Sequence, residues 1–418
     1  KGRIQDLIPT AQCAERYSAR ETRSLDQHHV LIPGLINTHT HAAMSLFRGL
    51  ADDLPLMDWL NNHIWPAEAR WVDTEFVRIG TRLAIAEMLR GGITCFNDMY
   101  FFPDAVAREA KQSGIRAAVG LIVIDFPTIW AQNADEYIAK ALAVNDEFRN
   151  EPIIHGVFAP HAPYTVSDGP LERIRTLADE LDLPIHMHVH ETAHEVQEAM
   201  ENSGERPLAR LDRLGLLSPN FLAVHMTQLT DEEIQLMADR GAHVVHCPES
   251  NMKLASGTCP VDQLKAAGVN IALGTDGAAS NNDLNLFGEM RSAALLAKHS
   301  TGDASAFNAH EALHAATLGG AKALGLEQET GSLSIGKSAD ITAVSLDALE
   351  CQPVYDPASH LVYAAGRRDV SHVWVAGREL LRDRQLTTID VETLKASVGE
   401  WAVKINQSDH AQADDTGE

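Results

Sequence analysis

The chain alternates between short apolar runs and longer segments in which apolar residues recur at helical spacing. The runs predict strands at Leu35–His41, Ile93–Met99, Arg116–Ile124, Ile153–Pro160, Pro184–His190, Phe221–Met226, Ala242–Cys247 and Asn270–Asp276. Helical periodicity lies between them, at Glu75–Arg90, Ala134–Phe148, Leu171–Leu181, Asp231–Arg240 and Leu284–Lys298. Eight strand–helix units over roughly 270 residues predict an α/β fold, a parallel (β/α)8 barrel of the TIM type. A doubly wound sheet is the alternative, but no Gly-x-Gly-x-x-Gly segment follows any expected strand to support it.

The pattern changes on both sides of the barrel region. Residues 1–30 are polar and poorly periodic, and after about Gly325 short strands alternate with tight turns. We therefore expect a barrel of residues 31–325 and a small β-sandwich domain built from both chain ends, residues 1–30 and 326–406.

Two segments depart from the alternation of strands and helices. The stretch 50–72 interrupts the first strand–helix unit and predicts a long loop with a short helix at the mouth of the active site. The polar stretch 407–418 is expected to be a disordered tail.

Composition narrows the class of protein. Of the 418 residues, 45% are hydrophobic and 22% charged, which is ordinary for a globular protein. The net charge of -24 disfavours nucleic-acid binding, because phosphates would be repelled, and no apolar run approaches the length of about 18 residues that spans a membrane. Five cysteines without a CxxC pair indicate a reducing cytoplasm. The chain starts at Lys1 without an initiator methionine or a visible signal peptide, so we expect residues upstream.

Two histidines close the first expected barrel strand. His39 and His41 are two residues apart in an extended segment that begins after the turn residues Pro33 and Gly34. Residues at this spacing point to the same face of a strand. The two imidazoles therefore make half of a zinc site, unless they are ordinary polar residues at a strand end.

Three other expected strands also end in residues that bind metals: His188 in a His-x-His-x-His alternation, His225, and Asp276 in Thr-Asp-Gly. Taken singly, His225 fits a buried barrel histidine and Thr-Asp-Gly fits a turn. Active sites of such barrels lie at the carboxyl ends of the strands, so all four groups are expected to face one cavity. Three histidines and an aspartate form a zinc shell with room for water.

The segment His190-Glu191-Thr192-Ala193-His194 also matches HExxH. In zincin proteases both histidines lie on one face of a helix. Here His190 ends a strand and Thr192 is the expected N-cap of the next helix, so this alternative is disfavoured. The zinc nucleobase deaminases with a PCxxC signature are excluded, because that segment is absent.

These motifs resemble the amidohydrolase superfamily: His39-Thr-His41, His188 followed by Glu191, His225, and Thr275-Asp276-Gly277. The resemblance covers nearly the whole chain, including Gly331–Asp340. Within the superfamily the chain is similar to 5'-methylthioadenosine/S-adenosylhomocysteine deaminases in the segments Pro66–Glu68, Ala159–Val166, His246–Gly257 and Asp276–Asn282. Triazine hydrolases and guanine deaminases share many of these segments.

The resemblance implies a zinc-dependent aminohydrolase with site residues as follows. The metal ligands are His39, His41, His188 and Asp276; the catalytic residues are Glu191, His225 and Asp276; the substrate-binding residues are Glu68, His161, Glu191 and Asp276. No lysine lies near the end of the strand at Ile153–Pro160, which favours one zinc ion per subunit; iron and manganese are the alternatives.

The implied substrate is a small-molecule nucleoside of the adenosine type. Asp125–Gln132 contains no arginine for an amino-acid carboxylate and includes Trp130, so 5'-methylthioadenosine is expected ahead of S-adenosylhomocysteine or adenosine. Another cyclic amidine, such as guanine or a triazine, is the alternative substrate. A non-catalytic assembly protein is the outside alternative, although every expected ligand is present. We expect a homo-oligomer, a dimer or a tetramer.

Overall fold

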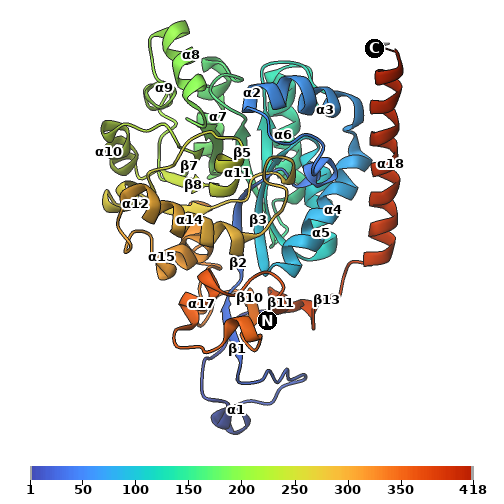
Figure 1. The fold of residues 1–418 in the computed structure, drawn as a ribbon, viewed down its shortest axis with the longest axis vertical. Helices are drawn as coiled ribbons and strands as arrows, with labels where there is room; N and C mark the ends of the chain where they lie inside the picture. Colours follow the sequence, from blue (N-terminus) through green and yellow to red (C-terminus); the bar gives the residue numbers. More distant parts are fainter. Residues whose placement is uncertain (1, 416–418) are drawn as a thin grey trace.

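Eight parallel strands form the body of the computed structural model, which describes residues 2–415, with side chains through residue 406 (Figure 1). In spatial order they are β2 (Leu35–Thr40), β3 (Ile93–Tyr100), β4 (Arg116–Val123), β5 (Ile154–Pro160), β6 (Ile185–Val189), β7 (Phe221–His225), β8 (His243–His246) and β9 (Ile271–Leu273). The first and last strands are also linked: the Thr38 hydroxyl of β2 donates to the Leu273 carbonyl of β9 at 2.7 Å. The predicted barrel is confirmed, and each strand agrees with its predicted range to within a few residues.

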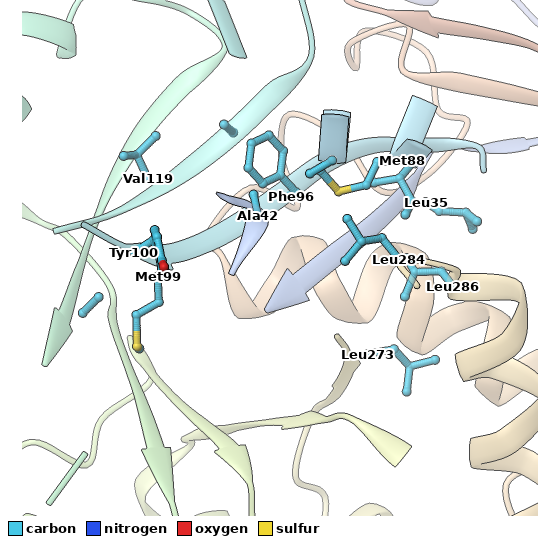
Figure 2. Close-up of a cluster of buried hydrophobic side chains, with 14 of the residues drawn as sticks. Leu35, Ala42, Met88, Phe96, Met99, Tyr100, Val119, Leu273, Leu284 and Leu286 are labelled. Atoms are coloured by element: carbon cyan, nitrogen blue, oxygen red, sulfur yellow. The ribbon is translucent and has the colours of Figure 1, made fainter. Parts of the chain in front are cut away.

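Helices cover the outside of the barrel. The longer ones are α4 (Thr74–Arg90), α5 (Pro103–Ser113), α6 (Ala134–Phe148), α7 (Asp168–Leu181), α8 (Ala193–Ser203), α10 (Asp231–Arg240) and α14 (Leu286–Thr301). Side-chain caps begin α4, α6, α8 and α10; in α4, Asp73 accepts from the Phe76 amide. Figure 2 shows Met88 of α4 and Leu286 of α14 near Leu35 of β2, in the apolar layer between strands and helices. No described helix has both the length and the apolar composition needed to cross a membrane.

The segment expected as a loop with a short helix is more helical than predicted. α2 (Leu56–Trp59), a wider π-type turn (Leu60–Ile64) and α3 (Trp65–Trp71) follow one another without a break. Pro66 directly follows the π-type turn, whose wider hydrogen-bonding pattern accommodates a residue that has no N–H to donate within a continuous helix. Trp59 and Ile64 are buried, so this helical segment packs over the barrel rather than extending into solvent.

The small β domain is one antiparallel sheet rather than a sandwich of two. Its order is β1 (His29–Pro33), β10 (Ile341–Ser345), β11 (Val370–Val375), β12 (Arg378–Arg382) and β13 (Gln385–Leu386). Helix α4 contacts β11, β12 and β13, so the barrel takes the place of a second sheet. The chain passes from β1 to β2 at Gly34, where an added Cβ would lie 2.0 Å from the Thr94 hydroxyl, so only glycine fits.

A buried ion pair ties this sheet to the barrel. Arg116, at the start of β4, places Nε 2.9 Å from Oδ2 of Asp340, just before β10. Both side chains are almost completely buried, and Asp340 also accepts from Ser338 and from the Ala376 amide. Removing one partner of such a pair typically costs about 3–5 kcal/mol. The contact gives the Gly331–Asp340 segment a structural role that the sequence alone did not reveal.

Helix α18 (Val391–Asp415) lies along α4 at the edge of the molecule (Figure 1). It packs Trp401 edge-on against Phe76, with ring centroids 5.3 Å apart. Residues 407–415 of the predicted disordered tail are part of this helix, and residues 416–418 lie outside the described residues. Ala411, Gln412 and Ala413 favour a helix, and no glycine or proline lies between Gln407 and Asp415. The division of the chain into domains stays a prediction.

Candidate active site

Four donor atoms meet where β2, β6 and β9 end. Nε2 of His39 lies 3.1 Å from Nε2 of His188, and Asp276 Oδ1 lies 3.3 Å from His39 Nε2 and 3.2 Å from His41 Nε2. Three imidazole nitrogens that converge with a carboxylate oxygen form a donor set suited to zinc. The structure therefore brings together the four residues predicted as metal ligands.

The opposite ring nitrogens of these histidines are already engaged. Nδ1 of His41 donates to the Met99 carbonyl at 2.6 Å, and Nδ1 of His188 donates to the His161 carbonyl at 2.8 Å. Nδ1 of His39 lies 3.0 Å from Nε2 of His186. Such outer partners fix the tautomer and direct Nε2 inward. Burial lowers the pKa of His39 to about 4, against the opposing pull of Asp276, so the ring is neutral and available as a ligand.

Two serine hydroxyls hold Asp276 in place. Its Oδ2 accepts from the Ser250 hydroxyl at 2.6 Å and from the Ser280 hydroxyl at 2.9 Å, which leaves Oδ1 toward the histidines. Its φ is +63°, a left-handed conformation that is costly for a residue with a side chain. Residues kept in such conformations by their surroundings are concentrated at functional sites.

His225 and Glu191 stand next to the donor set. Nδ1 of His225 donates to Asn251 Oδ1 at 2.8 Å, and its Nε2 lies 3.7 Å from Oε2 of Glu191. His225 also forms a group with His39 and His188 whose ligand atoms all lie within 4.8 Å of one another. The structure therefore places His225 beside the four predicted ligands and within reach of a metal.

Glu191 is positioned through its backbone. Its amide donates to Glu195 Oε2 at 2.7 Å, and the His190 amide donates to the other oxygen at 3.1 Å. Burial raises the pKa of Glu191, with the nearby Asp276 adding to the effect. A carboxyl group with a raised pKa is suited to donating a proton near neutral pH.

The two histidines of the HExxH segment do not converge. His190 is buried with Nε2 accepting from the Leu208 amide at 3.2 Å, whereas the His194 side chain is 64% exposed. The strand end separates them, as the alternation before His190 predicts, so this pair forms no shared metal site.

A cavity of about 530 Å³ opens above the donor set. All predicted site residues line it except His39, which lies beneath. Its walls are mainly apolar and come from Leu56, Trp59, Ile64, Trp65, Phe101, Ile124, Phe126, Ile129 and Tyr164. Burial raises the pKa of Glu68 on α3 to about 7. Among the described residues that line the cavity, none is lysine or arginine.

Trp130 does not reach this cavity, although the sequence placed it nearby. Its ring packs against Phe102, with centroids 5.0 Å apart, and Lys140 lies over its face. The neighbours Phe126 and Ile129 line the wall instead. The apolar character expected for this wall is present, but other side chains supply it.

The residues that hold the site were not identified from the sequence. His186 could have been predicted to lie at the site, because it is two residues from His188 and therefore lies on the same face of the strand. Ser250, Ser280 and Asn251 lie in segments that matched the family, but nothing local shows which site residue each one contacts. Those contacts depend on the closure of the barrel.

Comparisons with known proteins agree with this geometry. The amidohydrolase family model matches residues 30–380. A 5-methylthioadenosine/S-adenosylhomocysteine deaminase of Teredinibacter turnerae is 51% identical over 97% of this chain and 91% of its own. An adenosine deaminase structure from Xanthomonas campestris with bound zinc has a TM-score of 0.96 and 54% identity, covering 97% and 92% of the two chains. A zinc complex of an atrazine chlorohydrolase from Arthrobacter aurescens has a TM-score of 0.83 and 26% identity, covering 90% and 88%.

The donor set predicts the metal content of variants. We expect purified protein to hold about one zinc ion per chain, the number that one tetrahedral shell binds. His188→Ala should lose the metal, because it removes one of the converging nitrogens. His194→Ala is the matched control and should keep it, since that side chain is exposed on α8. Elemental analysis after gel filtration measures both, and zinc loss from His194→Ala alone would contradict the assignment.

Proposed function

The chain belongs to the amidohydrolase family, and from that membership we propose that it is a zinc-dependent deaminase of adenosine-type nucleosides. Its preferred substrate is 5'-methylthioadenosine, and water replaces the amino group of the purine to give the inosine analogue and ammonia. The observation that carries this proposal is the position of Glu191 and His225 beside four converging donors, under an apolar cavity whose described lining residues include no lysine or arginine. The Teredinibacter and Xanthomonas relatives support the same reaction.

The metal is held by His39, His41, His188 and Asp276. These three nitrogens and one oxygen fit zinc. Burial lowers the pKa of His39 to about 4 and that of His188 well below its usual value, whereas Asp276, acting against burial, raises the pKa of His41 to about 9, so zinc binding there would displace a proton. Zinc at this position makes water acidic enough to supply hydroxide near neutral pH.

Three side chains of the protein transfer protons or stabilise the charge that develops during the reaction. Asp276 accepts a proton from the attacking water, since its Oδ1 faces the cavity floor while Oδ2 is occupied by two hydroxyls. Glu191 donates a proton to the ring nitrogen beside the amino-bearing carbon, which makes that carbon electrophilic. His225 keeps its Nδ1–H on Asn251 and, in its doubly protonated form, donates from Nε2 to the oxygen that forms on this carbon. Collapse of the tetrahedral centre releases ammonia.

The remaining polar residues bind the nucleoside. Glu68 on the cavity wall accepts hydrogen bonds from two ribose hydroxyls. His161 has Nδ1 3.0 Å from the Thr165 hydroxyl, which leaves its other nitrogen for the substrate. The apolar wall that includes Phe126 and Ile129 receives the 5' substituent. A carboxylate in this position would be buried without a cationic partner, which is costly.

We also propose a cytoplasmic location and a homo-oligomer, a dimer or a tetramer. The location is supported by five free cysteines, four of them buried, which need no oxidising compartment. The oligomer rests on the family resemblance. The net charge of -24 argues against a nucleic-acid partner.

Substrate preference tests the proposed function. Ammonia release should be fastest with 5'-methylthioadenosine, measured against S-adenosylhomocysteine, adenosine, guanine and a triazine by kcat/KM. Ile129→Arg places a cation at the apolar wall and should raise kcat/KM for S-adenosylhomocysteine relative to 5'-methylthioadenosine. Faster turnover of S-adenosylhomocysteine by the unmodified chain would show that a carboxylate partner comes from elsewhere. Turnover of guanine or a triazine alone would replace the proposed substrate.

A substitution that exchanges one oxygen of Glu191 for nitrogen tests the role of this residue. Glu191→Gln keeps the shape and removes the titratable proton, so kcat should fall by about 10²–10⁴-fold while KM changes little. Zinc content and folding should stay the same, because Glu191 is not among the four ligands. Glu198→Gln, on the exposed face of the following helix α8, is the control and should keep full activity. If Glu191→Gln keeps most of its kcat, Glu191 only shapes the start of α8.

A further inference from the structure

Two very short helices supply the side chains that hold Asp276 and His225. α11 (Pro248–Lys253) carries Ser250, which donates to Asp276, and Asn251, which accepts from His225. α13 (Ala278–Asn281) carries Ser280, which also donates to Asp276. Helices of one or two turns are not stable by themselves. The geometry of the site therefore depends on what fixes these two helices in place.

A single buried carboxyl group contacts both of them. Glu289 lies on α14 and is 0% exposed. Its Oε2 accepts from the Glu249 amide in the first turn of α11 at 3.2 Å, and its Oε1 accepts from Asn281 Nδ2 of α13 at 2.5 Å. The same Asn281 nitrogen donates to the carbonyl of Thr275, the residue before Asp276, at 2.7 Å. Glu289 itself does not line the cavity.

The chemistry of this position requires a carboxyl group. A buried carboxyl is costly unless its oxygens are hydrogen-bonded, and burial raises the pKa of Glu289 well above its usual value. Two donors approach from two different helices, and a carboxyl offers an acceptor oxygen to each in either protonation state, because the protonated form keeps acceptor capacity beside its O–H. Glutamine has nearly the same shape but only one such oxygen, so its amide N–H₂ would face one of the donors.

We propose that Glu289 is a positioning residue for the deamination. It joins α11 to α13 and so holds Asp276 and His225 in their working orientation without touching substrate or metal. The expected effect on kcat rests on the proposed function. The mechanism by which Glu289 acts rests on the hydrogen bonds among described residues.

The direct test compares two buried glutamates. Glu289→Gln is set against Glu109→Gln, which removes a 3%-exposed carboxyl that bonds Arg82 between α4 and α5, away from the cavity. Both are assayed well below their unfolding temperatures. We expect Glu289→Gln to lower kcat and to speed zinc loss to a chelator, each on the order of 10-fold, with KM within about twofold. Glu109→Gln should lower the unfolding temperature and change neither kcat nor zinc release.

A double-mutant cycle shows whether Glu289 acts through α11. Asn251→Ala removes the partner of His225, so adding Glu289→Gln to it should cost much less kcat than Glu289→Gln costs alone. Additive losses, or a Glu289→Gln variant that only unfolds at lower temperature, would overturn the proposal. If Glu289→Gln does not fold, Asn281→Ala removes the bond from α13 to Glu289, together with the bond to the Thr275 carbonyl, leaves the bond to α11 intact, and should show the same increase in zinc release. Zinc release needs no substrate, so failure of the proposed reaction would be seen separately, as no ammonia from the unmodified protein.

Discussion

The structure depends on keeping three imidazoles and a carboxylate together inside an apolar barrel. Polar groups buried without partners cost several kcal/mol, so this arrangement persists only because each group has a second contact. His41 and His188 are fixed by backbone carbonyls, His39 is fixed by His186, and Asp276 is fixed by two serine hydroxyls. The free side of each group is what remains for a metal.

The two ends of the barrel differ in structure: one end is closed by the small sheet, and the other carries the site residues. At the floor, the Arg116–Asp340 pair and the small sheet close the structure and contribute no cavity residue. At the rim, the backbone takes left-handed conformations at His225 and Asp276, where the chain turns sharply to aim side chains inward. Stability at one end and strain at the other fit an enzyme whose reaction takes place at the carboxyl ends of the strands.

Much of the fold and part of the site were predictable from the sequence, because they follow from patterns that repeat over a few residues. Apolar runs located the strands, and the spacing of two residues placed His39 and His41 on one face. The prediction was weaker where the outcome depends on tertiary packing. The helical segment at 56–71 becomes ordered because it covers the cavity, and α4 replaces the second sheet that a sandwich needs. Ser250 meets Asp276 across 26 residues, and no local pattern encodes that contact.

The central claim is that one metal ion, held by these converging side chains, supports deamination of a nucleoside. The most direct measurement adds zinc stepwise to metal-free protein and follows ammonia release from 5'-methylthioadenosine. The structure predicts that the rate rises in proportion to zinc and stops rising at about one equivalent per chain, as one tetrahedral shell requires. Full activity without metal, or a rate that keeps rising to a second equivalent, would contradict the account.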